Sequence, residues 1–273
     1  MSRLEAALEV AREAARAAGT VALQGFRGQH EITSKGGSDI VTQFDHAAEE
    51  AALAVIRKAF PHHGVLAEES GHTRVEAPEG VAPADLDLLW MVDPIDGTHN
   101  YAAGLPFWCV SVAAVDPDTD LPQVAVIYDP LHDETFSAAR GRGALLNGKP
   151  LHAGERTELG SAMMAYDVGH NLVDAPRMLR LVQSVQPQVG RVRHLGSAAL
   201  AVAYVAAGRL DGFYHLNLNP WDVAAGMLLV TEAGGVVTDW EGNPRSSGQG
   251  PVIAAGAGLH ASLLALLRTA EKV

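Results

Sequence analysis

The sequence predicts an α/β protein with two different halves. In residues 1–150, two helical patterns are followed by a series of strand-like apolar runs, which is typical of an α+β arrangement. In residues 151–273, helical and strand patterns alternate, which is typical of an α/β arrangement. Neither a repeat nor a flexible linker separates the halves. We therefore expect two fused lobes that form one structural unit.

The helices of the first half are indicated by apolar spacing. Between residues 3 and 24, apolar side chains recur at helical intervals with charged residues opposite, which predicts an amphipathic helix. The glycine-rich segment that follows is irregular apart from a strand signal at residues 39–42. A second helix over residues 44–60 ends before Pro-His-His-Gly, which stops it. We expect His62 and His63 in that stop to be solvated.

The rest of the first half contains a loop and several strands. Residues 71–87 are rich in proline, glycine and charge and predict an exposed loop. The Asn147-Gly148 step predicts a two-residue hairpin turn. The segment VLAEES (residues 65–70) is a short apolar strand entry that ends in two acids, and strand-like runs follow at residues 88–93, 107–115, 123–128 and 134–139.

In the second half, helices and strands follow one another. Asn219 suits the N-cap of a helix, Pro220 its first position, and Asp222 then lies in its first turn. Helices are predicted over 174–186, 197–208, 220–233 and 257–270, and strands near 162–166, 192–194, 210–215, 236–238 and 251–255.

Composition excludes several classes of function. The formal net charge is −12 and no stretch is dense in lysine and arginine, so we expect no direct binding of nucleic acid. No apolar run reaches the ~18 residues that a membrane span needs. The N-terminus lacks the apolar core of a signal peptide, so we expect a cytoplasmic protein without a membrane partner. The single cysteine, Cys109, lies in an apolar run and is predicted to be a buried core thiol.

Four acidic residues lie where an apolar element ends or a helix begins: Glu68, Asp93, Asp96 and Asp222. Singly, Glu68 would be a solvated charge at a strand end, the two middle acids would be turn residues, and Asp222 would be a helix-dipole acid. Open α/β sheets, however, collect their ligands at the carboxyl ends of strands. Acids gathered there would repel one another unless cations lie between them. The pattern therefore favours Mg²⁺, which prefers carboxylate oxygens and shares its ligands with phosphate.

The residues around these acids favour phosphate chemistry. Gly97 permits a close backbone approach, and amide groups at a helix start bind phosphate. Thr98 adds a hydroxyl that would orient a water. Asp93 and Asp96 are three positions apart, which disfavours the Asp-x-Asp spacing of an aspartyl-phosphate enzyme. An EF-hand loop is also disfavoured, because its alternating acids and its glutamate at position 12 are missing.

The segment DPIDGTHN (residues 93–100) resembles the first signature of the inositol monophosphatase superfamily. WDVAAGMLLVTEAGG (residues 221–235) is similar to its second signature. AEES (residues 67–70) is similar to the Glu-Glu-Ser element that precedes the first. Further matches occur near residues 34–49 and 195–214. The resemblance implies a layered αβαβα sandwich of the inositol monophosphatase and fructose-1,6-bisphosphatase type, a homodimer, and Mg²⁺-dependent hydrolysis of phosphate monoesters.

The resemblance also implies roles for individual residues. Glu68, Asp93 and the Ile95 carbonyl would hold a first Mg²⁺, and Asp93, Asp96 and Asp222 a second. Glu68 would reach a third ion through water, so that residues 1–150 supply most of the metal and phosphate site. The attacking water would lie near Glu68 and Thr98, with Asp45 supporting Thr98. Substrate would contact Gly97, Thr98, Gly196, Ser197, His215 and Asp222.

Two departures from the family pattern fall on the alcohol side of the site. His215 stands where a glutamate usually contacts the ring hydroxyls, and MMAYDVGHN (residues 163–171) lacks the usual Thr-Gly-Phe. His215 is either a surface residue at a strand end or part of an altered alcohol-binding rim. Alternatives therefore stay open: a small polyol or sugar phosphate such as inositol 1-phosphate, fructose 1,6-bisphosphate, histidinol phosphate or a 3′-phosphoadenosine nucleotide. A regulatory role with the RNA machinery is the alternative of a different class.

Overall fold

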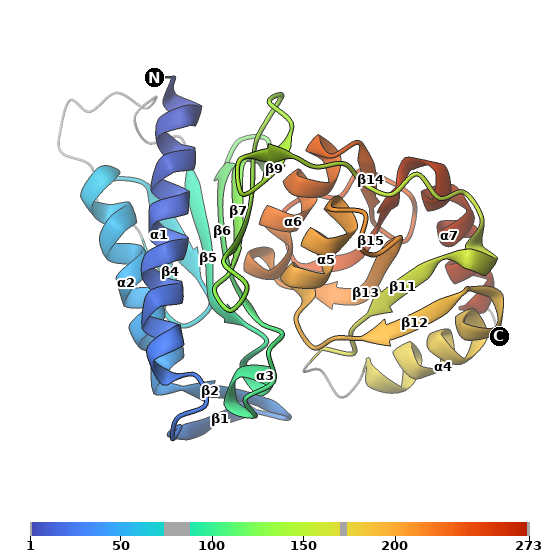
Figure 1. The fold of residues 1–273 in the computed structure, drawn as a ribbon, viewed down its shortest axis with the longest axis horizontal. Helices are drawn as coiled ribbons and strands as arrows, with labels where there is room; N and C mark the ends of the chain where they lie inside the picture. Colours follow the sequence, from blue (N-terminus) through green and yellow to red (C-terminus); the bar gives the residue numbers. More distant parts are fainter. Residues whose placement is uncertain (1, 74–87, 170–173, 272–273) are drawn as a thin grey trace.

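The computed structural model describes residues 2–73, 88–169 and 174–271, whose elements form five layers in the order helix, sheet, helix, sheet, helix (Figure 1). The predicted αβαβα sandwich is confirmed. Three apolar cores fill the spaces between the layers: one beneath the N-terminal helices, one around the middle helices and one beneath the C-terminal helices. The division into halves at residue 150 stays a prediction.

The first helical layer consists of α1 (Arg3–Gly25) and α2 (Gln43–Ala59). Each helix begins with a capping box, formed by Ser2 with Glu5 and by Thr42 with Asp45. The face of α1 that packs on the sheet consists largely of alanine, so the helix axis can approach the strands closely. Its fully buried alanines are Ala7, Ala11, Ala14, Ala15, Ala18 and Ala22.

The first sheet has eight strands in the order β10-β9-β8-β7-β6-β5-β3-β4. Only the β3–β5 pairing is parallel. Side chains alternate between its faces, so Val110 and Val112 meet the α1–α2 layer while Cys109 meets the middle helices. The prediction of a buried Cys109 is confirmed. The strands are β3 (Gly64–Ala67), β4 (Gly71–Thr73), β5 (Leu89–Asp96), β6 (Cys109–Asp116), β7 (Leu121–Asp129), β8 (Glu134–Ala139), β9 (Ala144–Leu146) and β10 (Lys149–Pro150).

The middle layer consists of α5 (Ala198–Ala206) and α6 (Pro220–Glu232), which lie between the two sheets (Figure 1). Both are buried on almost all sides, as expected for helices that are apolar all round. A Cβ atom at Gly226 would lie 2.6 Å from Val202 Cγ1, so glycine is what allows α6 to approach α5 this closely.

The second sheet has five strands in the order β12-β11-β13-β15-β14, and α4 (Ala175–Val185) and α7 (Ala257–Ala270) cover its outer face (Figure 1). Strand β11 runs parallel to both of its neighbours, β12 and β13, and β15 runs antiparallel to both of its own. The strands are β11 (Met163–Tyr166), β12 (Arg191–His194), β13 (Gly212–Leu218), β14 (Gly235–Thr238) and β15 (Gly250–Gly256). Short 3-10 turns occur at Leu159–Ser161 and Gln186–Gln188.

The six predicted helices are each confirmed to within two residues at either end. Three other predictions need correction. The segment before residue 39 is not wholly irregular, because β1 (Ile32–Gly36) pairs with β2 (Asp39–Thr42). Residues 71–73 belong to β4, and the rest of the predicted loop, residues 74–87, lies outside the described residues. His63 is buried rather than solvated, because its Nδ1 accepts a hydrogen bond from Trp90 and its ring stacks on Phe60.

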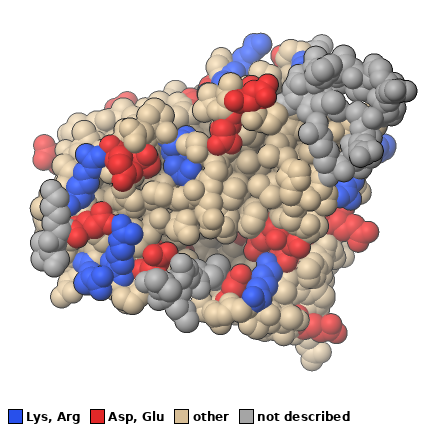
Figure 2. Space-filling view, turned by 180° about the vertical axis from the view of Figure 1, so that it is seen from behind, with Lys and Arg blue, Asp and Glu red and all other residues tan. Residues whose placement is uncertain are grey.

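Within the described ranges, no helix is long and apolar enough to cross a membrane. On the face shown in Figure 2, acidic and basic side chains are interspersed and the surface is hollowed near its middle.

Candidate metal and phosphate site

A cavity of about 590 Å³ is lined by residues from two parts of the chain, 35–100 and 167–249. The fold brings most of the predicted site residues to its wall, although they are far apart in sequence. Asp45 and Ser197 do not line it, and both are buried. The predicted residues on the wall are Glu68, Asp93, Ile95, Asp96, Gly97, Thr98, Gly196, His215 and Asp222.

The parallel pair β3–β5 brings Glu68 and Asp93 together. Ala67 pairs with Val92, and the Glu68 N–H donates to the Val92 carbonyl at 3.1 Å, so both acids leave the same edge of the sheet. Beyond Asp93 the register shifts before Asp96 pairs with Cys109. The strand therefore does not end at Asp93 as predicted but continues through an irregular step to Asp96. The Ile95 N–H donates a hydrogen bond to Asp93 Oδ1 at 3.0 Å, which stabilises this step.

The electrostatics of this acid cluster are unfavourable for negative charge. Burial is the main cause that raises the pKa of Asp93, and the charges of Glu68, Asp96 and Asp222 raise it further. Burial likewise raises the pKa of Glu68 and of Asp222. The acids are thus close enough that the negative charge of each opposes the ionisation of the others. A divalent cation bound among them would favour the ionised carboxylates instead.

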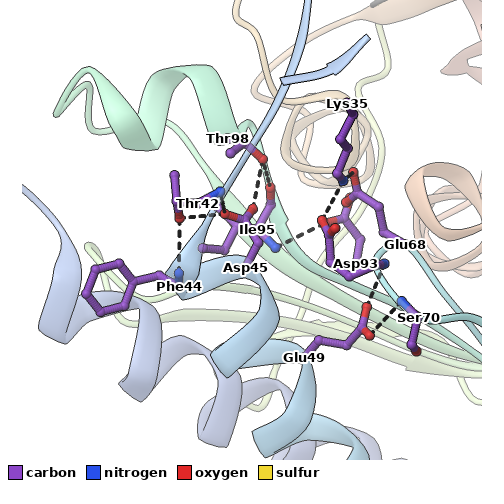
Figure 3. Close-up of polar contacts among 11 residues, drawn as sticks. Lys35, Thr42, Phe44, Asp45, Glu49, Glu68, Ser70, Asp93, Ile95 and Thr98 are labelled. Atoms are coloured by element: carbon purple, nitrogen blue, oxygen red, sulfur yellow. Dashed lines mark hydrogen bonds and ion pairs between the residues drawn. The ribbon is translucent and has the colours of Figure 1, made fainter. Parts of the chain in front are cut away.

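Lys35 supplies a positive charge to this cluster. It reaches over from β1, and its Nζ lies 3.0 Å from Glu68 Oε1 and 2.5 Å from Glu69 Oε1 (Figure 3). Burial lowers its pKa, but the two carboxylates raise it more, so Lys35 stays protonated. The Glu69 carboxyl is only 3% exposed, and burial raises its pKa to about 7.

Asp96 connects the two halves of the chain. Its carboxylate accepts hydrogen bonds from the Ser197 hydroxyl, from Ala199 N–H at 2.8 Å and from Ala198 N–H at 3.3 Å. Ser197 itself makes no side-chain cap, so Asp96 caps α5 from a distant strand. Burial raises the pKa of Asp96, and these donors oppose that rise. Donors from the protein thus partly offset the effect of burial on Asp96.

Asp222 occupies the third position of α6, as the sequence predicts. Its Oδ2 accepts from the Asn219 N–H at 2.9 Å, which completes a capping box with the predicted Asn219 cap. The cap fixes the direction of the Asp222 side chain at the N-terminus of the helix and places it on the cavity wall. A local helix signal therefore positions a candidate ligand.

Asp45, Thr98 and Ile95 form a hydrogen-bonded group beside Glu68 and Asp93 (Figure 3). Asp45 Oδ2 accepts from the Thr42 N–H and hydroxyl, and its Oδ1 lies 3.0 Å from the Thr98 hydroxyl. The Asp45–Thr98 contact that the resemblance implies is therefore present. The Thr98 hydroxyl also lies 3.1 Å from the Ile95 carbonyl, and it can donate to only one of these acceptors at a time.

The donor set suits a hard divalent cation. Carboxylates and a backbone carbonyl are the ligands that Mg²⁺ prefers, and no sulfur or imidazole ligand lies among the predicted ligands. Even so, no three Asp, Glu, His or Cys side chains within residues 2–73, 88–169 and 174–271 are already gathered as a metal cage. In this arrangement Glu68 forms an ion pair with Lys35 instead.

Several residues of the wall were not named from the sequence, among them Lys35, Asp167 and His194, and the place of His215 was left open. Each of these three lines the cavity and has an ion-pair or hydrogen-bond partner that is distant in sequence. No local pattern therefore predicts its place on the wall. Asp167 does lie in the segment that departs from the family pattern. His215 is not a surface residue at a strand end; it is 3% exposed within β13.

Comparisons with known proteins show which family the chain resembles in sequence and fold. The profile of the inositol monophosphatase family matches residues 3–272. The Escherichia coli protein called Nus factor SuhB is 38% identical over 265 residues, which are 96% of this chain and 95% of that protein. The structure of an extragenic suppressor protein suhB from Bartonella henselae superposes with a TM-score of 0.87 at 35% identity, covering 96% of this chain and 98% of that one. An inositol monophosphatase from Anabaena gives 0.85 at 36%, covering 98% and 97%. The chain therefore belongs to the inositol monophosphatase family.

Proposed function

We propose that this protein is a Mg²⁺-dependent phosphomonoesterase that acts on a small polyol or sugar phosphate similar to inositol 1-phosphate. The observation that carries the proposal is the gathering of Glu68, Asp93, Asp96 and Asp222 at one cavity, each with a raised pKa. Buried acids at such close quarters destabilise a protein unless a cation is bound among them. Membership of the family supports a hydrolytic role for that cation.

The ligands of the ions are part of the proposal. Glu68, Asp93 and the Ile95 carbonyl would hold one Mg²⁺, and Asp93, Asp96 and Asp222 a second. A third would lie near Glu68. When bound, the ions would activate a water and offset charge on the departing alkoxide.

The chain's own groups would orient the reactants. The Thr98 hydroxyl donates a hydrogen bond to Asp45 or to the Ile95 carbonyl, so its oxygen can accept a hydrogen bond from a water beside Glu68. The N–H groups of Gly97 and Thr98 would bind phosphate. Gly97 suits this role because its φ of +101° and its tight surroundings require a residue without a side chain. Gly196 and His215 would border the alcohol, whereas Ser197 is buried beneath the wall and donates its hydroxyl to Asp96.

The proposal is tested by phosphate release from a panel of sugar and polyol phosphates with and without Mg²⁺. The panel contains inositol 1-phosphate, fructose 1,6-bisphosphate, histidinol phosphate and a 3′-phosphoadenosine nucleotide. Asp93→Asn should abolish release while circular dichroism shows an intact fold. Asp118→Asn, on an exposed turn, is the matched control and should behave as wild type. Near-normal turnover of the Asp93 variant would refute the metal assignment.

A second candidate function is a regulatory role with the transcription machinery. The observation that favours it is the name Nus factor SuhB, which several relatives at 37–38% identity bear. A protein partner fits this role better than direct RNA contact, because the net charge is −12 and the face in Figure 2 has no extended basic patch. Recovery of transcription proteins in a pull-down, with Asp93→Asn still functional in cells, would favour this role over catalysis. Light scattering would test the homodimer that we also expect.

A further inference from the structure

The turn at residues 68–70 carries Glu68, a candidate cation ligand, at the edge of the first sheet. It joins β3 to β4, which has only three residues and is the last strand of that sheet. On one side, the Glu68 N–H donates to the Val92 carbonyl of β5. The N–H groups of the next two residues, Glu69 and Ser70, have an acceptor on α2 instead. The direction of the Glu68 side chain therefore depends on a helix as well as on the sheet.

Glu49 is the acceptor on α2. Its Oε2 accepts from the Glu69 N–H at 2.8 Å, and its Oε1 accepts from the Ser70 N–H at 2.9 Å (Figure 3). The Glu49 side chain is buried, with the residue only 4% exposed, whereas Ser70 is exposed. The Ser70 N–H could bond water without the cost of burying a carboxylate. A buried carboxylate that binds both N–H groups restricts the turn in a way that water would not.

Helix α2 holds a second part of the site through the same face. Asp45 lies one helical turn before Glu49, so the two carboxylates project from the same side of α2. Asp45 accepts from the Thr98 hydroxyl at 3.0 Å, and buried apolar residues such as Ile56 anchor the helix in the first core. Among the described residues, neither acid lines the cavity, so each acts through the residue that it binds.

We propose that Glu49 is a positioning residue for cation binding, which holds the turn so that the Glu68 carboxylate is directed at the acid cluster before a cation arrives. The inference rests on the proposed function and deepens it. Without Glu49, the turn would adopt conformations in which Glu68 points elsewhere, and only a fraction of the molecules would be ready to bind. The apparent affinity for the cation falls with that fraction. A saturating concentration of cation would restore the turn, because the bound ion itself holds Glu68.

The test measures Mg²⁺ binding by titration calorimetry without substrate, and phosphate release from inositol 1-phosphate at increasing Mg²⁺ concentrations. In Glu49→Gln an amide nitrogen replaces one acceptor oxygen, so one N–H of the turn loses its partner. The Kd for Mg²⁺ and the half-activating Mg²⁺ concentration should both rise about 10-fold, as is usual on losing a hydrogen bond to a charged group. At saturating Mg²⁺, kcat and KM should stay close to the wild-type values. Glu50→Gln, at the next and exposed position of α2, is the matched control and should change none of these quantities.

A second variant separates position from charge. Glu49→Asp keeps the negative charge, but its side chain is one methylene shorter and does not reach both N–H groups. It should also raise the Kd for Mg²⁺, whereas a long-range attraction between Glu49 and the cation would leave the Kd unchanged in this variant. A wild-type Kd in Glu49→Asp or in Glu49→Gln would overturn the inference alone. Variants that circular dichroism shows to be unfolded in a chelator would also overturn it, because Glu49 would then support the fold rather than the site. A wild type that releases no phosphate in Mg²⁺ would overturn the proposed function and the inference with it.

Discussion

Replacing Gly97 with alanine should distort the point where the two halves meet at the site. Gly97 has a φ of +101°, and a Cβ atom there would lie 2.9 Å from the Gly196 carbonyl oxygen and 3.2 Å from the Phe107 carbonyl oxygen. Both are backbone atoms and cannot rotate away. The left-handed conformation costs an alanine ~1–2 kcal/mol. The displaced backbone adds ~1–3 kcal/mol.

A matched control separates these two costs. Gly148 has a φ of +77° but no atom within 4 Å of a built Cβ, so Gly148→Ala should show the conformational cost alone. At roughly 2–4 °C per kcal/mol, Tm should fall by ~5 °C in Gly148→Ala and by ~10 °C in Gly97→Ala. The measurement is thermal unfolding in a chelator, followed by phosphate release with Mg²⁺.

Activity should separate the two variants more strongly than Tm. Gly97→Ala pushes Asp96 away from the N–H groups of Ala198 and Ala199, and a misplacement near 1 Å can cost ~100-fold in rate. Gly148→Ala lies in a hairpin outside the cavity and should keep wild-type turnover. Equal Tm values for the two variants, with full activity in Gly97→Ala, would refute the claim that the close approach at Gly97 builds the site.

Three further predictions concern the charges and the hydroxyl at the site. Because the pKa of Glu69 rises from 4.5 to about 7 on folding, its stabilising contribution is present below pH 4.5 and is lost as pH rises through 7. The measurement is the Tm of wild type minus the Tm of Glu69→Gln, in a chelator. This difference should fall between pH 4.5 and 7, by an amount equivalent to ~3 kcal/mol at most. A difference that does not change with pH would contradict the raised pKa of Glu69. Lys35→Met should destabilise the metal-free protein and enlarge the Tm gain on adding Mg²⁺, since the ammonium no longer competes for Glu68. Lys149→Met, on exposed β10, is its control, and a smaller gain in Lys35→Met than in wild type would argue against competition. Thr98→Val should lower kcat ~100-fold with little change in KM, whereas Thr98→Ser should retain activity, and equal rates for the two would remove the hydroxyl from the mechanism.

Local signals along the chain determined the helices and one of the candidate ligands. Apolar spacing and cap residues depend only on neighbours in sequence, so they fixed α6 together with its Asn219 cap and the first-turn Asp222. Asn147 and Gly148 likewise have positive φ angles of +49° and +77°, as a two-residue hairpin turn requires. The two signatures predicted the family and three acids of the cavity wall, Asp93, Asp96 and Asp222.

Pairing across the sheets was decided only by the tertiary structure. The sequence does not reveal that β3 runs parallel to β5, which brings Glu68 and Asp93 to one edge, or that Asp96 caps α5 about a hundred residues later. The local sequence at His63 is compatible with a solvated side chain and with one that is hydrogen-bonded to Trp90. Only packing decides between these two states. The contact between Asp167 and His194 depends on the register of β11 against β12. Register and packing depend on many contacts between residues that are distant in sequence, so no single local pattern determines them.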